Sequence, residues 1–199
     1  MRDFLARERR FAVAFSGGTD SALLLGAAKL AGCDVAAYMV KTAFHPQFEL
    51  EDARAVAEAL GVPLRVIQAD VLAQEDICEN PPDRCYLCKR FIFEQIKTAA
   101  AEDGFATVVD GTNGSDDPSR RPGFRALAEA GIVSPLRRAG LSKEQVRQLS
   151  TEVEESLALP PNALKGAKPS FPCLAVFVPE GTPLTQKSLA EAASKRSIA

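Results

Sequence analysis

The sequence predicts an α/β fold: a doubly wound, mostly parallel five-stranded sheet with helices on both faces. Apolar runs alternate with stretches of helical periodicity in the order strand–helix–strand–helix–strand, which right-handed crossovers produce. The run at 35–40 is apolar throughout, as expected for a parallel strand covered on both faces. A chain of 199 residues is long enough for one core of ordinary size with a small appendage.

The individual elements follow from periodicity and from helix-breaking residues. Gly32 and Gly61 end the first two long helices, and the prolines of Asn80-Pro81-Pro82-Asp83 exclude a helix there. After a polar helix or tail at 1–10, we expect the five strands of the sheet at 11–15, 35–40, 64–69, 107–109 and 132–133, with 174–178 as a further candidate strand. The expected helices are 21–31, 49–60, 87–101, 123–130, 142–157 with a Ser cap, and 185–195.

A glycine loop at 15–21, Phe-Ser-Gly-Gly-Thr-Asp-Ser, follows the first strand and opens the first long helix. Ligands of such sheets bind at this carboxyl edge. Gly17 and Gly18 let backbone N–H groups close around an oxyanion, while Ser16 and Ser21 add hydroxyl donors beside the helix dipole. No lysine precedes Ser21, so this is not the GxxxxGK[ST] loop. The loop predicts phosphate binding; an ordinary glycine turn with a Ser cap is the alternative.

Other candidate ligands of a nucleotide lie at the same edge. Asp20 would orient Mg²⁺, or only cap the helix. We expect ATP or AMP on the loop, including Thr19, with adenine near the end of the second strand. The remaining candidates are Met39, Val40 and Lys41 for the base, Gly111, Thr112 and Asn113 for adenylate or substrate, and Arg121, Arg125 and Lys168 for phosphate. Simple solvation is the alternative for the three cations.

The five cysteines indicate metal, cluster or sulfur chemistry rather than a disulfide framework in a reducing compartment. Cys85 and Cys88 form a C-x-x-C pair at a helix entry, where N–H groups and the cations Arg84, Lys89 and Arg90 should favour thiolate. Cys173 would supply a third thiolate, which leaves one iron of a 4Fe–4S cluster open. A zinc site is weaker, because His45, the one histidine, lies on another loop. Cys33 is expected in the core, and Cys78 competes as a ligand.

Composition excludes several classes of function. A net charge of −2 gives no general drive toward nucleic acid or membrane. No apolar run approaches the roughly 20 residues that span a bilayer, and residues 1–10 lack an apolar signal core. We therefore expect a cytoplasmic protein with no membrane or nucleic-acid partner.

Several motifs, in order along 11–185, resemble the LarE family of ATP-dependent sulfur transferases, within the PP-loop ATP-pyrophosphatase superfamily. They are Ser-Gly-Gly-x-Asp-Ser, Asn80-Pro81-Pro82-Asp83-Arg84-Cys85-Tyr86-x-Cys88-Lys89, Asp110-Gly111-Thr112-Asn113, Arg121-Pro122-Gly123-x-Arg125, Ser134-Pro135-Leu136, Ala139-Gly140-Leu141-Ser142-Lys143 and Pro172-Cys173-Leu174-Ala175. The resemblance implies an adenine nucleotide alpha hydrolase-like fold.

The resemblance also implies a reaction. A carboxylate of pyridinium biscarboxylic acid mononucleotide is adenylated with release of pyrophosphate, and sulfur then displaces AMP to give a thiocarboxylate. In some family members one cysteine, matching Cys173, gives up its own sulfur. In others, three cysteines matching Cys85, Cys88 and Cys173 hold a 4Fe–4S cluster that carries a further sulfide. This chain has all three, which favours the cluster, with sulfide or cysteine as sulfur donor.

The chain also departs from the family pattern. Val176-Phe177 stands where the family usually reads Ser-Arg, the connection 149–168 is longer than usual, and little matches the family's C-terminal domain after Ser188. We therefore expect a PP-loop domain at 1–170, a remnant of a C-terminal sulfur-transfer and oligomerisation region at 171–199, and weakened homo-oligomer formation. A transfer-RNA thiolase, an amide-forming ligase and a non-catalytic adenine-nucleotide binding module remain alternatives.

Overall fold

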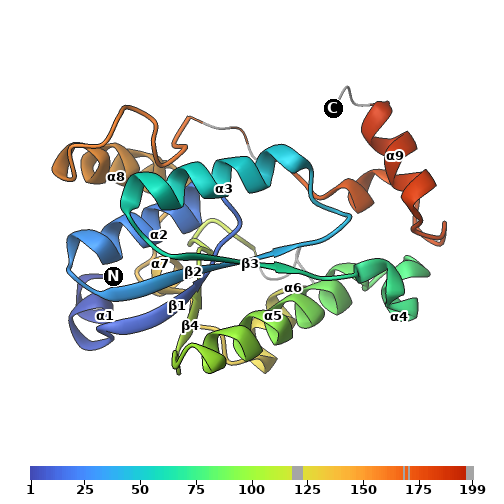
Figure 1. Cartoon of the computed structure of the whole chain (residues 1–199), viewed down its shortest axis with the longest axis horizontal. Coiled ribbons are helices and arrows are strands. Elements are labelled where there is room, and N and C mark those ends of the chain that lie inside the picture. The colour runs from blue at the N-terminus through green and yellow to red at the C-terminus, as the bar shows by residue number, and fades with distance from the viewer. Residues whose placement is uncertain (118–122, 168, 170, 196–199) are drawn as a thin grey trace.

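The computed structural model describes residues 1–117, 123–167, 169 and 171–195. Its centre is a parallel sheet in the order β3-β2-β1-β4 (Figure 1). The strands are β1 (Arg10–Ala14), β2 (Asp34–Lys41), β3 (Leu64–Gln68) and β4 (Val108–Asp110). Ala14 is in register with both Tyr38 and Asp110, so β1 and β4 end level at the carboxyl edge while β2 continues past them to Lys41.

The doubly wound parallel fold is confirmed, but the sheet has four strands in the described part of the chain, not five. The expected strand at 132–133 is a single parallel bridge between Val109 and Val133. Val133 N–H donates to the Val108 carbonyl at 3.1 Å, and Asp110 N–H donates to the Val133 carbonyl at 2.9 Å. The segment extends no further because Pro135 begins a helix two residues later.

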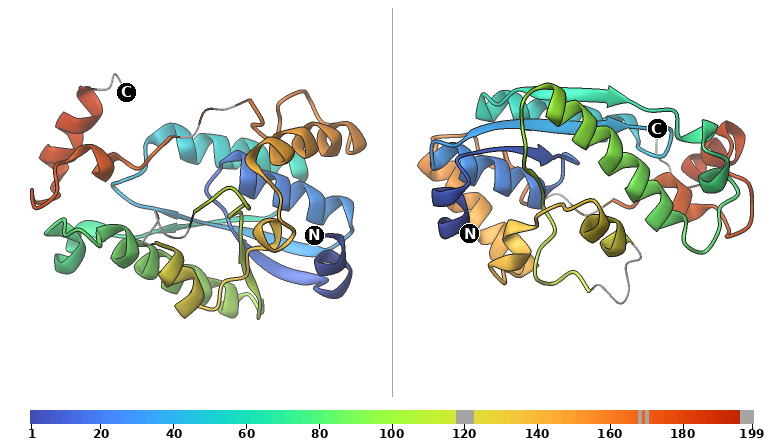
Figure 2. Two further views of the ribbon diagram at one scale, coloured as in Figure 1. Left: turned by 180° about the vertical axis from the view of Figure 1, so that it is seen from behind. Right: turned by 90° about the horizontal axis from the view of Figure 1, so that it is seen from below.

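Helices cover both faces of the sheet (Figures 1 and 2). One face carries α2 (Thr19–Leu30), α3 (Gln47–Leu60) and α8 (Lys143–Ser156), and the other carries α5 (Arg84–Glu102) and α6 (Gly123–Glu129). Successive side chains of a strand point to opposite faces of the sheet, so each face has its own core. Phe11 and Val13 belong to one buried cluster and Ala12 to the other. Short helices α1 (Arg2–Arg7) and α7 (Pro135–Arg138) complete this part.

A smaller apolar core, the satellite core, lies beyond the carboxyl edge, at the end of the molecule that carries both α4 and α9 (Figure 1). It is built by η1 (Val71–Ala73), α4 (Glu75–Cys78), η3 (Leu174–Phe177) and α9 (Gln186–Ser194) around Phe44, Ile77 and Leu189. The side-chain amide of buried Asn80 donates to the carbonyls of Pro179 at 2.8 Å and Thr182 at 3.2 Å. The segment after residue 171 is thereby tied to the connection before α5.

The prediction of a strand at 174–178 is wrong, because this run forms the 3-10 helix η3. Its backbone bonds are local: Val176 N–H donates to the Cys173 carbonyl, and Val178 N–H to the Ala175 carbonyl. A short apolar run does not distinguish a strand from a buried helical turn, and burial of Leu174 decides the outcome here. In the part of the chain that the structure describes, no helix is both long enough and apolar enough to cross a membrane.

Candidate active site

The glycine loop is shaped by close contacts that only glycine allows. Gly17 has φ +74°, and a Cβ there would lie 2.9 Å from the Glu49 carbonyl oxygen. A Cβ at Gly111, after β4, would lie 2.6 Å from the backbone nitrogen of Ser21. The Ser21 hydroxyl donates to the Gly18 carbonyl at 3.1 Å and accepts from Ser16 N–H at 3.4 Å. The loop is therefore pinned between α3 and the end of β4 at the N-terminus of α2.

Asp20 lies at the centre of a charged network. Its Oδ2 is 2.6 Å from Lys143 Nζ, and its Oδ1 accepts from the Asn113 amide at 3.1 Å. Lys143 is placed by a capping box in which the Ser142 hydroxyl accepts from Gln145 N–H and the Gln145 side chain accepts from Ser142 N–H. Sequence reasoning missed Lys143 as a site residue. The one feature of the sequence that could have indicated Lys143 is its position directly after Ser142, the residue that caps α8.

Two adjoining cavities open at this edge. The sheet-edge cavity, about 270 Å³, is lined by an apolar wall of Met39, Val40, Ile92 and Phe93 and by polar Asp110, Gly111 and Thr112. The cysteine cavity, about 240 Å³, is lined by Gly18, Thr19, Glu49, Lys143, Pro169, Phe171 and Cys173. Ser16, Asp20 and His45 line both cavities. One cavity therefore has an apolar wall, the other reaches the thiol of Cys173, and residues of the glycine loop line both.

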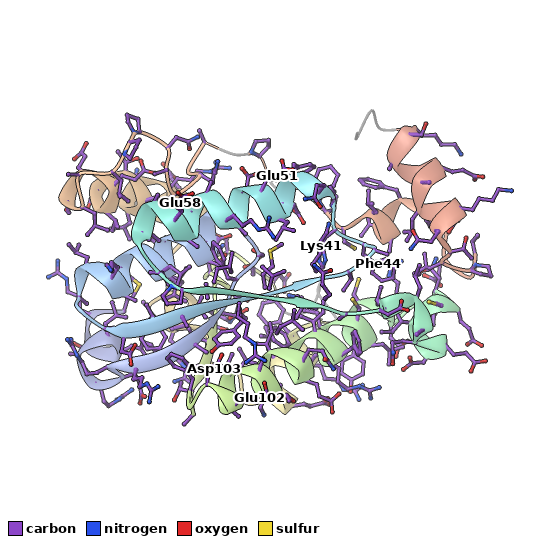
Figure 3. The ribbon with its side chains drawn as sticks, in the orientation of Figure 1. Lys41, Phe44, Glu51, Glu58, Glu102 and Asp103 are labelled. Carbon is purple, nitrogen blue, oxygen red and sulfur yellow. The ribbon has the colours of Figure 1, made fainter. Side chains whose placement is uncertain are left out.

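The structure places the remaining nucleotide candidates in different surroundings. Lys41 is the last residue of β2 and donates to the carbonyls of His45 and of Pro46, the latter at 3.0 Å (Figure 3). Thr19 donates its hydroxyl to the Lys165 carbonyl at 2.7 Å and so anchors the 160s loop. Arg125 lies away from both cavities, 2.8 Å from Glu129 and 4.1 Å above the Tyr86 ring. Arg121 and Lys168 lie outside the described residues.

The three candidate sulfur ligands come from two segments. Cys85 and Cys88 lie in the first turns of α5, and Cys173 immediately precedes η3. Arg84 connects the segments: one nitrogen donates to the Ala175 carbonyl at 2.9 Å, and the other lies 3.7 Å from Cys85 Sγ. The thiol of Cys88 interacts electrostatically with those of Cys85 and Cys173.

The expectation that Cys88 is a thiolate is wrong for the chain on its own. Burial and the two neighbouring thiols raise the pKa of Cys88 to about 12, and nearby Lys89 and Arg84 lower it by less. Burial also raises the pKa of Cys173, against the lowering effects of Arg84 and backbone N–H groups. Within the described ranges, no three His, Cys, Asp or Glu side chains are gathered as a metal-ion site.

The other two cysteines have local partners. Cys33 is buried and its thiol lies 3.5 Å from the Leu5 carbonyl. Cys78 donates to the carbonyls of Val71 and Leu72 at 3.4 Å, and burial raises the pKa of its thiol. Both thiols therefore serve local packing in this structure.

A parallel sheet with this glycine loop at its carboxyl edge defines a PP-loop ATP pyrophosphatase domain. A family model described as queuosine biosynthesis protein QueC matches residues 10–79. Protein slr1717 of Synechocystis sp. is 36% identical over 191 residues, covering 95% of this chain and 68% of the relative. The chain belongs to the LarE-like family of PP-loop ATP pyrophosphatases.

Two further relatives match a smaller part of the chain. The pyridinium-3,5-bisthiocarboxylic acid mononucleotide synthase of Lactiplantibacillus plantarum is 35% identical over 147 residues, 73% of this chain and 53% of that enzyme. Protein MJ0830 of Methanocaldococcus jannaschii is 32% identical over 155 residues, 78% of this chain and 58% of the relative. The chain thus spans little more than half the length of these two relatives.

Proposed function

We propose that this protein adenylates a carboxylate of pyridinium biscarboxylic acid mononucleotide and replaces the AMP by sulfur, giving a thiocarboxylate. The observation that carries the proposal is the shared wall of Ser16, Asp20 and His45 between the sheet-edge cavity and the cavity that contains Cys173. The substrate is inferred from the Lactiplantibacillus plantarum relative, which is a synthase of the corresponding bisthiocarboxylic acid mononucleotide. An amide-forming ligase would need no cysteine cavity beside its adenylate.

In the first step, a substrate carboxylate oxygen attacks the α-phosphorus of ATP and pyrophosphate leaves with the electron pair of the broken P–O bond. The glycine loop and the N-terminus of α2 offer N–H donors to the departing charge. Met39 and Val40 offer an apolar wall to adenine. Gly111, Thr112 and Asn113 follow β4 at the same edge, where adenylate or substrate would lie.

Asp20 and Lys143 would both help to bind the triphosphate, Asp20 through Mg²⁺ and Lys143 by direct contact with phosphate. In the structure they neutralise each other at 2.6 Å. Mg²⁺ prefers carboxylate and phosphate oxygens, so Asp20 would turn to the metal when Mg·ATP enters. Lys143 is then released toward phosphate and supplies the cation that the glycine loop lacks.

In the second step, sulfur attacks the acyl carbon and AMP leaves. We propose that Cys85, Cys88 and Cys173 hold a 4Fe–4S cluster, because their thiols are soft ligands, Cys88 interacts electrostatically with the other two, and Arg84 links the two segments that carry them. The cluster would supply a binding site for exogenous sulfide. Loading must deprotonate buried thiols and draw them together, which makes it pH-dependent. The unpaired, free cysteines fit a reducing compartment such as the cytoplasm.

Nucleotide binding is tested by calorimetry with ATP and Mg²⁺. The wild type should bind, whereas Asp20→Ala and Gly17→Val should lose at least about tenfold in affinity, since each removes a feature of the phosphate site. Asp3→Ala is the matched control, because this exposed acid lies on α1. Unchanged affinity in both loop variants would contradict the assignment.

Cluster formation is tested by anaerobic reconstitution followed by iron and sulfide quantification. The proposal predicts about four irons per chain, and less than half as much in Cys88→Ser or Cys173→Ser. Cys78→Ser is the control, because its thiol bonds to carbonyls of η1. If instead wild-type Cys173 loses the mass of one H₂S after turnover, the cysteine's own sulfur is used.

A further inference from the structure

His45 occupies the loop between β2 and α3 and lines both cavities. Its position is fixed from two sides. The Lys41 ammonium donates to the carbonyls of His45 and Pro46, and Leu174 N–H donates to the Phe44 carbonyl at 2.9 Å. Figure 3 shows Lys41 at the end of β2 and Phe44 in the loop that follows, between the layers of α3 and α5. The histidine is therefore held at the junction of the sheet, the satellite core and the glycine loop.

Thr42 selects one tautomer of the His45 ring. Its backbone N–H lies 3.4 Å from Nδ1 and can only donate, so Nδ1 acts as an acceptor. The Thr42 hydroxyl is 3.1 Å from the same atom and already accepts from Phe44 N–H at 3.2 Å, which leaves its proton for Nδ1. In the neutral ring the proton then resides on Nε2, on the side of the ring away from Thr42.

The surroundings keep the ring neutral. Burial and the positive charges of Lys41 and Lys89 lower the pKa of His45 to about 4. Asp20 lines both cavities with His45, Asp110 and Asp116 line the sheet-edge cavity, and Glu49 lines the cysteine cavity; these acids do not outweigh the lowering effects. Near neutral pH His45 is thus a hydrogen-bond donor that neither carries a charge nor gives up a proton.

We propose that His45 is a catalytic oxyanion donor, whose Nε2–H contacts the acyl carbonyl oxygen of the adenylate when sulfur arrives from the cysteine cavity. The inference rests on the proposed function and deepens it. Of the three residues common to both cavities, Ser16 belongs to the phosphate loop and Asp20 is paired with Lys143. His45 supplies the third wall, where the acyl group of the adenylate must face the incoming sulfur.

The step balances without an oxidant or reductant. The lone pair of a sulfide ion forms the C–S bond, and the carbonyl π electrons move to oxygen. The Nε2–H group hydrogen-bonds that oxyanion and keeps its proton. When the carbonyl re-forms, the C–O bond to phosphate breaks and AMP leaves with the electron pair. Loss of one such donor typically costs about 100-fold or more in rate.

Two variants separate the donor from mere packing. His45→Phe keeps a flat ring but has no N–H, whereas His45→Gln places an amide N–H close to the position of Nε2. With ATP, the pyridinium biscarboxylate mononucleotide and inorganic sulfide, we expect single-turnover thiocarboxylate formation to slow about 100-fold in His45→Phe and less than about tenfold in His45→Gln. ATP affinity should stay within about threefold in both. Equal slowing of both variants would overturn the donor role.

A second readout does not depend on turnover. His45 is the one histidine of the chain, so ¹⁵N-histidine labelling gives a single pair of ring nitrogens. At pH 7 we expect a protonated Nε2 and an unprotonated Nδ1, with Nε2 shifting when nicotinoyl-sulfamoyl adenosine, a stable acyl-adenylate mimic, is added. If, in a sample labelled with ¹⁵N at glycine as well, the mimic shifts the amides of Gly17 and Gly18 but leaves the His45 ring signals unmoved, the inference falls and the nucleotide site stands. If neither responds, the proposed function fails and the inference falls with it.

Discussion

At the glycine loop, backbone groups approach so closely that a Cβ at Gly17 or Gly111 would meet backbone atoms at 2.9 or 2.6 Å, and Asp20 is already paired at 2.6 Å. Around Cys88 and Cys173 the thiols are half-buried and held neutral by burial, and one arginine joins their two segments. The nucleotide end, formed by the glycine loop and Gly111, is therefore preorganised. The sulfur end, around Cys88 and Cys173, is completed only when its thiols are deprotonated and a sulfur species binds.

The largest expected effect lies at the preorganised end. Gly111→Ala would place a Cβ against backbone atoms of Asp20 and Ser21, which no rotamer change can relieve. We expect a loss of about 3 kcal/mol in the free energy of unfolding and loss of ATP binding. Denaturant titration and calorimetry measure the two effects.

Gly166→Ala is the matched control for this substitution. The nearest atoms to a Cβ at Gly166 are 3.7 Å away, an ordinary contact. Its free energy of unfolding should stay within about 0.5 kcal/mol of the wild type. Equal destabilisation by both substitutions would show that the loop is not unusually tight.

Lowering the pH should reduce the free energy of unfolding through His45, which lies between the nucleotide site and the cysteine site. The pKa of His45 is about 4 in the folded chain and about 6.5 when unfolded. Between these values the unfolded chain binds more protons, so the free energy of unfolding falls as pH decreases from about 6.5 to 4, by up to about 3 kcal/mol. His45→Gln should remove this part of the pH dependence in denaturant titrations. A variant with the same acid profile as the wild type would contradict the neutral, buried ring.

Raising the pH should also lower the free energy of unfolding, here through Cys88, whose pKa is raised rather than lowered. The pKa of Cys88 is raised from 9.0 to about 12, so the folded chain retains a proton that the unfolded chain releases. Stability from this thiol is present below pH 9.0 and is lost as pH rises toward 12. Cys88→Ser should flatten the decline in the free energy of unfolding over that range. An unchanged alkaline profile would place Cys88 in a wetter environment than the structure shows.

A smaller effect is expected when the brace between the two cysteine segments is removed. Arg84→Ala deletes the bonds to Asn80, Ala175 and Cys85. We expect a loss of about 2 kcal/mol in the free energy of unfolding and faster alkylation of Cys173 by iodoacetamide, followed by mass spectrometry. Arg84→Lys should restore little, since an ammonium lacks the planar fork. If Arg84→Ala changed ATP affinity by as large a factor as Cys173 reactivity, the nucleotide end and the sulfur end would not be structurally independent.

Sequence reasoning captured what depends on local pattern. The strand–loop–helix of the glycine loop, the paired cysteines and the wall of Met39 and Val40 all follow from elements close in the chain. Lys143 was missed because 123 residues separate it from Asp20, and no periodicity reports that ion pair. The protonation of Cys88 was mispredicted because burial outweighs neighbouring cations, and burial is a property of the packed structure. The turn at 174–177 was decided in the same way, by the satellite core.

The central claim is that adenylate and sulfur meet across one shared wall, and single-turnover product analysis of Cys173→Ser tests it most directly. With ATP, Mg²⁺, the pyridinium biscarboxylate mononucleotide and sulfide, the reconstituted wild type should release pyrophosphate and AMP and form thiocarboxylate, detected by mass spectrometry. Cys173→Ser should still release pyrophosphate when the carboxylate is present but form no thiocarboxylate. Equal thiocarboxylate from both proteins, or no carboxylate-dependent pyrophosphate release by the wild type, would contradict the account.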